Sequence, residues 1–248
     1  MAETVVVVTG ASSGIGAALA ELLGSRGALV VLVARRDAAL REAAVRSGPN
    51  ALAIVADVTK RADVRRVVEE ALARFGHIDV WINNAGQGIT RPPSQLTDED
   101  IDEMVRSNVK SALYGMQEIL PHFKVRNAGH VINVSSMLGR IPFVMTRSAY
   151  NGAKHFLNAL TANFRMEVQQ THPGIHFSLV SPGTVATDFG LNARHGGPDS
   201  RKIPDAQSAR EIAEVIAGII DSKRPDVYTH RGSRERVDSY FSTLGEDP

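Results

Sequence analysis

The sequence of 248 residues contains no cysteine, which excludes disulfides and thiolate metal sites and is compatible with a reducing compartment. Its net charge is only +1, because 28 Lys and Arg are balanced by 27 Asp and Glu. This charge gives no electrostatic reason to expect nucleic acid or an anionic membrane as a partner. It also lacks an apolar run of about 18 residues, and no basic region followed by a long apolar one opens the chain. We therefore expect a soluble, cytoplasmic protein with a small-molecule partner, no signal peptide and no membrane span.

Short apolar and β-branched runs recur along the chain, with segments of helical spacing between them. The runs cover residues 4–9, 28–34, 51–56, 78–83, 130–135, 175–181 and 226–230. Most are apolar throughout rather than alternating, which is typical of parallel strands buried on both faces. This order predicts an α/β fold: a Rossmann-type doubly wound parallel sheet of about seven strands in three α/β/α layers. Ligands of such a sheet bind beyond the carboxyl ends of its strands.

No internal repeat or linker divides the chain, so a single domain over residues 1–248 is the simplest organisation. Helix starts are indicated by Thr97 with Asp100 and by Ser208 with Glu211, both patterns of a capping box. A loop at about 183–204, rich in Gly, Pro and Asn, is long enough to be functional or mobile, and we expect it to contact substrate. Residues 231–248 are predicted to form a polar tail.

A glycine-rich turn, TGASSGIG at residues 9–16, follows the first expected strand and opens a helix. Backbone amides of such a turn can approach a pyrophosphate, and the helix N-terminus supplies partial positive charge. A turn of this kind can also be only a tight connection. Its place after a buried N-terminal strand favours nucleotide binding.

Three further segments end strands at the same predicted edge. The second strand ends at Arg35 and Arg36, where an NAD site of this type has an acidic residue for the ribose hydroxyls. Arg35 can instead pair with the 2′-phosphate of NADP, although a solvated arginine pair opening a helix is the alternative. Asp57 and Val58 end the third strand. The NNAG segment at 83–86 follows the fourth, where small residues would admit a flat ring or simply form a turn.

Tyr150 and Lys154 are four residues apart in the segment SAYNGAK, which has helical spacing. On one helix face, the Lys154 ammonium can lie near the Tyr150 hydroxyl and favour its ionised form. Tyrosine, with an ordinary pKa of about 10, is a poor base at neutral pH, and a nearby cation together with an oxidised nicotinamide would bring its pKa closer to neutral. The same spacing arises by chance in many helices, so the pair alone does not indicate catalysis.

The motifs TGASSGIG, NNAG, Asn108, INVSS, YNGAK and SPGTVAT occur in an order and at spacings that resemble the short-chain dehydrogenase/reductase family. The resemblance extends from Val5 to about Thr229, and Arg35 fits the NADP-preferring branch. It implies a site for NADP(H), preferred over NAD(H). The corresponding residues are Gly10, Ser12, Ser13, Gly14, Ile15, Gly16, Arg35, Arg36, Asp57, Val58, Asn84, Ala85, Gly86, Tyr150, Lys154, Pro182, Gly183, Val185 and Thr187.

The resemblance also implies four catalytic residues. Tyr150 would be the proton donor and acceptor, and Lys154 would bond the nicotinamide ribose as well as assist the tyrosine. Asn108 would support a water-linked proton relay to the lysine, and Ser136 would steady the substrate carbonyl. Ser136 precedes Tyr150 by one residue more than is usual in the family, which an extra residue in the IPFVMTR loop would accommodate. Ser135 is the alternative, because neighbouring residues on an extended strand face opposite ways.

The implied activity is an NADP(H)-dependent interconversion of a carbonyl and a primary or secondary alcohol by hydride transfer. The alternatives are a cofactor-binding sensor or partner module without turnover, and an epimerase or dehydratase that uses a transient keto intermediate. The expected substrate residues are Gln87, Ile89, Leu138, Phe143, Phe189 and Leu191. Because most are apolar, we expect a lipophilic or aromatic substrate.

Two further expectations concern ions and assembly. Arg91 or Arg194 could bind an acidic substrate, although solvation at the surface is the favoured interpretation for each. The eight histidines show no ligand cluster, so no metal is expected. The family resemblance implies a homodimer or homotetramer that packs through two long helices, here at about 98–123 and 148–171.

Overall fold

The computed structural model describes residues 3–245, so the ends of the predicted domain and tail, residues 1–2 and 246–248, lie outside the described residues. Its strands are β1 (Val5–Thr9), β2 (Leu29–Ala34), β3 (Leu52–Val55), β4 (Val80–Asn83), β5 (Gly129–Val134), β6 (Ile175–Ser181) and β7 (Asp226–Tyr228). Its α-helices are α1 (Gly14–Ser25), α2 (Asp37–Arg46), α3 (Arg61–Phe75), α4 (Asp98–Val105), α5 (Ser111–Arg126), α6 (Ser148–Gln169), α7 (Ala209–Ser222) and α8 (Ser233–Phe241). The seven predicted strands are confirmed.

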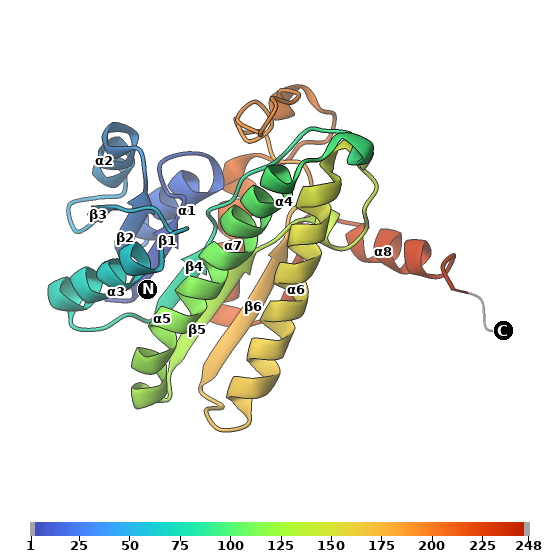
Figure 1. Cartoon of the computed structure of the whole chain (residues 1–248). Coiled ribbons are helices and arrows are strands. Elements are labelled where there is room, and N and C mark those ends of the chain that lie inside the picture. Colours follow the sequence, from blue (N-terminus) through green and yellow to red (C-terminus); the bar gives the residue numbers. More distant parts are fainter. Residues whose placement is uncertain (1–2, 246–248) are drawn as a thin grey trace.

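The strands form one parallel sheet in the order β3-β2-β1-β4-β5-β6-β7, with helices on both faces (Figure 1). This is the predicted Rossmann-type doubly wound fold. The strand order reverses between β1 and β4, so the chain leaves these neighbouring strands toward opposite faces. A crevice therefore opens where Thr9 and Asn83 end their strands.

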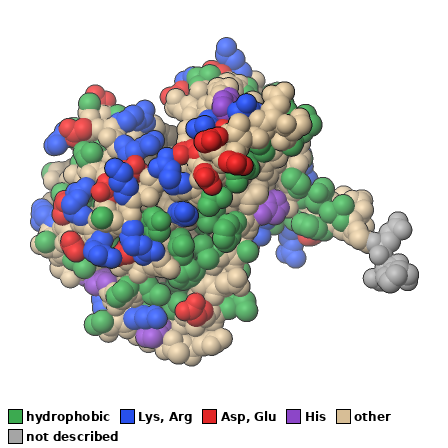
Figure 2. Space-filling view, in the orientation of Figure 1, with side chains coloured by type: hydrophobic (Ala, Val, Ile, Leu, Met, Phe, Trp, Pro, Cys, Tyr) green, Lys and Arg blue, Asp and Glu red, His purple; other side chains and the backbone are tan. Residues whose placement is uncertain are grey.

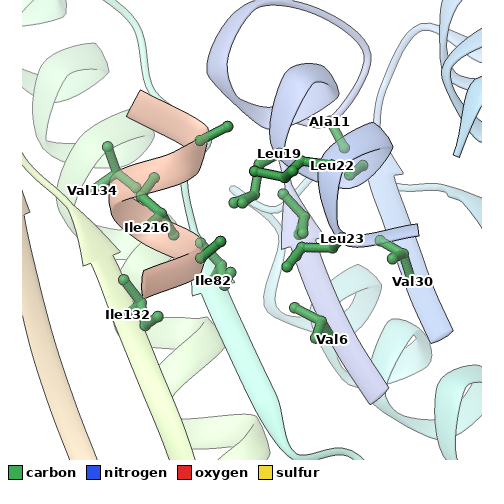
Figure 3. Packing of buried hydrophobic residues seen from close by; sticks show 14 of the residues in the cluster. Val6, Ala11, Leu19, Leu22, Leu23, Val30, Ile82, Ile132, Val134 and Ile216 are labelled. Atoms are coloured by element: carbon green, nitrogen blue, oxygen red, sulfur yellow. The ribbon is translucent and has the colours of Figure 1, made fainter. Parts of the chain in front are cut away.

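Alternate residues of each strand supply the two cores, which explains why the strands are apolar throughout. Val6 and Val8 belong to the core under α1 and α7, and Val5 and Val7 belong to the core under α3, α5 and α6. Figure 3 shows the first core, where leucines of α1 and Ile216 of α7 lie over the sheet. Burial on both faces removes the alternating pattern of a half-exposed sheet.

The predicted long helix at 98–123 is confirmed with one difference in its geometry. A π-helical turn, Arg106–Lys110, separates α4 from α5. Such a turn contains one residue more than an α-helical turn and commonly marks a functional site. Both predicted capping boxes are present, at Thr97 for α4 and at Ser208 for α7.

The prediction of a polar tail over 231–248 is wrong for its first half, because α8 occupies Ser233–Phe241 and projects from the body of the molecule (Figure 1). Val237 and the partly buried Tyr240 pack against Ile141. The Arg236 guanidinium lies 4.2 Å from the centre of the Phe143 ring. The sequence of this segment is mostly polar, so only these tertiary contacts distinguish its helix from a loop.

Two kinds of feature do not occur in the part of the chain that the structure describes. No helix there has the length and apolar content that a membrane crossing requires. No group of three or more His, Asp or Glu side chains is placed to hold a metal ion in that part either.

A chain of buried hydrogen bonds attaches α6, the helix that carries the tyrosine–lysine pair, to the middle of the sheet. Trp81 Nε1 donates to Asn83 Oδ1 at 2.8 Å, and Asn83 Nδ2 donates to Asn133 Oδ1 at 2.8 Å. Asn133 Nδ2 in turn donates to Thr161 Oγ1 at 2.8 Å. All four side chains are buried, so each loses its solvation and depends on these partners.

Asn133→Ala should lower the free energy of unfolding by about 2–4 kcal/mol, because Asn83 and Thr161 would each lose a buried hydrogen bond. Urea unfolding measures the change. Asn163→Ala, at an exposed position of α6, the helix that Asn133 contacts, is the matched control and should change stability by less than about 0.5 kcal/mol. Equal effects of the two substitutions would contradict a stabilising role for these buried hydrogen bonds.

Candidate active site

A cavity of about 650 Å³ lies at the carboxyl edge of the sheet, over the crevice between β1 and β4. Every residue predicted to hold the cofactor lines it except Gly16. A Cβ at Gly16 would clash with the carbonyl oxygen of Gly10 and lie 2.6 Å from Asn84 Nδ2. Gly16 therefore allows α1 to pack closely against the turn, and this packing role is distinct from contact with a ligand.

Hydrogen bonds between the ends of β1 and β4 hold the two rims of the crevice together. Thr9 Oγ1 accepts from the backbone N–H groups of Asn84 and Ala85 at 3.0 and 3.1 Å. Asn84 Nδ2 donates to the carbonyl of Thr9 at 2.9 Å. Gly10 and Gly14 have φ angles of +69° and +57°, which L side chains rarely adopt. The turn is thus a narrow cradle of backbone groups, and it fits a pyrophosphate.

Two arginines line the cavity where β2 ends. Arg36 Nη2 donates to the hydroxyls of Ser12 and Ser13 at 3.1 and 2.7 Å. Arg35 lies close enough to Asp57 to affect its titration. Burial by itself would raise the pKa of Asp57, but hydrogen bonds from Thr59 and the charge of Arg35 hold it below its ordinary value. This end of the cavity therefore has two exposed guanidinium groups within reach of a ligand.

The structure brings Ser136, and not Ser135, to the hydroxyl of Tyr150. Burial raises the pKa of Tyr150 to about 12, against the lowering effects of a hydrogen bond with Ser136 and of the charge of Arg147. Ser135 Oγ instead donates to Asn158 Oδ1 at 2.5 Å. The extra residue between Ser136 and Tyr150 is taken up by residues 137–149, which contain two short 3₁₀ turns.

Lys154 is buried, and its ammonium contacts a backbone carbonyl. Its Nζ donates to the carbonyl of Val134 at 2.9 Å and lies 5.6 Å from the centre of the Tyr150 ring. Burial lowers the pKa of Lys154 to about 8. We predicted that Lys154 would lower the pKa of Tyr150. In the protein alone, burial dominates the pKa of Tyr150 and the cation that opposes it is Arg147, so the combined effect of Lys154 and an oxidised nicotinamide stays a prediction.

Asn108 lies in the π-helical turn, behind the wall of the cavity. Its Nδ2 donates to the carbonyl of Gln87 at 2.9 Å, and its Oδ1 accepts from the Gln87 N–H at 3.2 Å. A Cβ at Gly86 would lie 2.7 Å from Asn108 Oδ1 and 3.6 Å from Lys154 Nζ. The amide and the ammonium are therefore neighbours across Gly86, although Asn108 does not itself line the cavity.

Four of the six residues predicted to contact substrate line the other end of the cavity: Gln87, Leu138, Phe143 and Phe189. The other two do not. Ile89 is fully buried in a small core with Met104, and Leu191 is exposed on the loop outside the lining. Loop position alone could not distinguish these side chains, because their orientation depends on how the loop is anchored.

Asp100 anchors that loop, and this role was missed in the sequence, where the residue was identified only as part of a cap. Its buried carboxylate accepts from Arg91 Nη1 at 2.9 Å, from Arg194 Nε and from His195 Nε2 at 2.8 Å. Burial would raise the pKa of Asp100, but these partners hold it well below its usual range. Arg91 and Arg194 are thus paired with Asp100 and not free to bind an acidic substrate, while their side chains, 30% and 36% exposed, stay partly solvated.

Asp100→Asn should lower the free energy of unfolding by about 1–3 kcal/mol, because it weakens the charged hydrogen bonds that the buried carboxylate accepts from Arg91 and Arg194. Hydrogen exchange at residues 189–197 should become faster. The stabilising effect should be present at neutral pH and lost in acid, because the pKa of the folded carboxyl is lowered.

The matched control is Asp199→Asn, which removes an ion pair with the exposed Arg201 and should have a much smaller effect on stability than Asp100→Asn. Unchanged exchange in the Asp100 variant would contradict the anchoring role.

Fold and cavity together are those of a nucleotide-binding oxidoreductase, and comparison with known proteins identifies its family. The profile described as short chain dehydrogenase matches residues 4–196. An uncharacterized oxidoreductase of Staphylococcus epidermidis is 36% identical over 194 residues, 76% of this chain and 83% of that protein. The chain therefore belongs to the short-chain dehydrogenase family, as the motifs predicted.

Solved structures show the same similarity over nearly the whole chain. The 3-ketoacyl-(acyl-carrier-protein) reductase of Brucella melitensis, complexed with NADH, matches with a TM-score of 0.83 and 28% identity, over 93% of this chain and 98% of that one. The alcohol dehydrogenase of the archaeon Thermococcus sibiricus, complexed with 5-hydroxy-NADP, matches with a TM-score of 0.79 and 27% identity, over 91% and 95%.

Proposed function

We propose that the protein is an NADP(H)-dependent oxidoreductase that interconverts a carbonyl and a primary or secondary alcohol by hydride transfer. The observation that carries the proposal is one continuous cavity, lined at one end by the glycine turn and at the other by Ser136, Tyr150 and Lys154. The two similar structures, one with NADH and one with 5-hydroxy-NADP, support a nicotinamide cofactor. A scaffold protein would not require these groups in one cavity.

The preference for NADP(H) rests on the charge at the end of β2. An acidic residue there would accept from the ribose hydroxyls of NAD, whereas this chain has Ala34 followed by Arg35 and Arg36. A guanidinium can form two parallel hydrogen bonds to a phosphate. In this proposal both arginines face the 2′-phosphate, the glycine turn and Thr187 hold the pyrophosphate, and Val185 lies at the nicotinamide.

The chemistry of the protein groups follows from their protonation. When bound, the nicotinamide supplies the hydride acceptor or donor. Tyr150, with a pKa of about 12, keeps its proton at neutral pH and can give it to a carbonyl oxygen during reduction. Ser136 can donate a hydrogen bond to the same oxygen. Lys154 would return a proton to Tyr150 and recover one from solvent through the water-linked relay that Asn108 would support, and oxidation would follow the reverse path.

We also propose that two or more copies associate through α5 and α6. Figure 2 shows hydrophobic side chains gathered over these helices on the face toward the viewer. Among the exposed residues are Val125 of α5 and Phe156 and Met166 of α6. Exposed apolar area of this kind on neighbouring helices favours an interface between copies, here a homodimer or homotetramer.

Tyr150→Phe should reduce the rate of NADPH-dependent carbonyl reduction by about 100-fold to 10 000-fold, because it removes the proton donor. Cofactor affinity, measured by calorimetry, should be unchanged. Tyr114→Phe, which lies outside the cavity lining, is the control and should keep full activity.

A panel of lipophilic, aromatic and acidic carbonyl compounds, followed at the absorbance of NADPH, measures the rate. Consumption of one NADPH for each alcohol formed would distinguish net reduction from epimerisation or dehydration. A retained rate in Tyr150→Phe would contradict the role of Tyr150 in the mechanism.

Arg35→Ala should weaken NADPH binding by about 1–3 kcal/mol and leave NADH binding unchanged, because only NADPH has the 2′-phosphate. Titration calorimetry with each cofactor measures the difference. Arg41→Ala is the control, since this exposed arginine of α2 pairs with Asp37. Equal loss of affinity for both cofactors would contradict selection by Arg35.

A further inference from the structure

Arg147 lies at the substrate end of the cavity and has no ion-pair partner among residues 3–245. It ends a 3₁₀ turn, Met145–Arg147, and directly precedes α6. Its side chain lines the cavity, and its Nη1 is buried without a hydrogen-bond partner in the described part of the chain. Removing a guanidinium from water without a counter-charge is unfavourable, so a partner is expected.

Apart from Arg35 and Arg36 at the nucleotide end, the other arginines near the cavity have such partners. The pairs are Arg91 and Arg194 with Asp100, Arg106 with Glu103, and Arg201 with Asp188 and Asp199. Asp188, which also lines the cavity, is thus already engaged by Arg201. Among the described residues, carboxylates of the protein therefore neutralise these arginines but not Arg147, which can accept an anion from outside.

Two glycines surround the Arg147 guanidinium. A Cβ at Gly88 would clash with Nη1, and a Cβ at Gly197 would lie 3.4 Å from Nη2. The same Cβ at Gly197 would lie 2.9 Å from Thr90 Oγ1, another buried polar atom without a partner among the described residues. That Cβ would also clash with the carbonyl oxygen of Gly190, so the position is packed, and it shows only that Thr90 Oγ1 and the Arg147 guanidinium are close neighbours.

The guanidinium is also close to the reacting groups. Its charge acts on the hydroxyl of Tyr150, three residues further along the chain. The ring of Phe189 lies beside both residues, with its centre 5.9 Å from Arg147 Cζ and 5.6 Å from the centre of the Tyr150 ring. A group held by Arg147 would therefore belong to the same molecule that offers its carbonyl to Tyr150.

We propose that Arg147 binds a carboxylate of the substrate, so that the protein acts on an acidic carbonyl compound or hydroxy acid rather than on a neutral lipophilic one. This inference rests on the proposed function, because it uses Tyr150 as the site of the reacting carbonyl. Arg147 can form two parallel hydrogen bonds to a carboxylate. Leu138, Phe143 and Phe189 then contact the carbon part of the substrate.

Two aldehydes of nearly the same shape test the proposal. 4-Carboxybenzaldehyde carries a carboxylate, and methyl 4-formylbenzoate is its neutral ester. The native protein should reduce the acid with the higher kcat/KM. Arg147→Met should lower kcat/KM for the acid by about 10-fold to 100-fold, the scale of a lost charged hydrogen bond. The loss for the ester should be much smaller, because the ester loses only the effect of the Arg147 charge on Tyr150. Arg147→Lys, which retains the charge, should keep part of the preference.

The matched control is Arg210→Met, which removes one positive charge from an exposed arginine of α7 and should change neither rate. Equal kcat/KM for the two aldehydes in the native protein would overturn the proposal, and this comparison needs no variant to fold. Equal losses for both aldehydes in Arg147→Met, with a shifted pH profile, would also overturn it, because Arg147 would then act on Tyr150 alone.

A binding measurement can test the anion site independently of the proposed oxidoreductase activity. Benzoate, titrated calorimetrically into the protein with its cofactor, should bind to the native protein and lose affinity in Arg147→Met. That result without turnover of either aldehyde would support the anion site and contradict the oxidoreductase proposal. Turnover of the ester without benzoate binding would support the oxidoreductase proposal and contradict the anion site. Inorganic phosphate that binds as tightly as benzoate would indicate a general anion site and overturn the assignment to a carboxylate substrate.

Discussion

The hydrogen bonds of Thr9 with Asn84 and Ala85 are the constraint on which the rest of the site depends. They join the ends of β1 and β4 at the point where the strand order reverses. The glycine turn continues from one of these strands, and the segment that contacts Asn108 and Lys154 continues from the other. Any change in their separation would therefore move the cofactor cradle relative to the groups proposed for proton transfer.

Burial gives the two ends of the cavity different chemistry. At the nucleotide end, Arg35 and Arg36 are exposed and remain available as cations. At the other end, burial disfavours charge on both members of the tyrosine–lysine pair, so it raises the pKa of Tyr150 and lowers that of Lys154. A neutral tyrosine suits proton donation to a carbonyl. At this buried end, the guanidinium of Arg147 has no counter-charge among residues 3–245, and in our proposal a substrate anion supplies it.

The fold and much of the cavity could be predicted from local patterns. The apolar runs predicted all seven strands, and the motifs at their carboxyl ends predicted most of the residues that line the cavity. Two errors had a common cause. Leu191 was assigned to the pocket although it points out of it, and α8 was assigned to a tail. Both depend on contacts between segments far apart in the chain. Arg147 was missed although it is the only charged residue between Arg140 and Lys154, a signal that the sequence does contain.

By itself, the sequence determined that the chain folds as a doubly wound sheet, that a glycine turn opens its first helix, and that Tyr150 and Lys154 share a helix face. These features follow from hydrophobic period and backbone geometry, which act over a few residues. Only the tertiary structure decided which serine meets Tyr150, which cation acts on it, and which arginines Asp100 neutralises. Each of these depends on burial and on distances between side chains far apart in the sequence, because desolvation and charge pairing arise only when the elements pack.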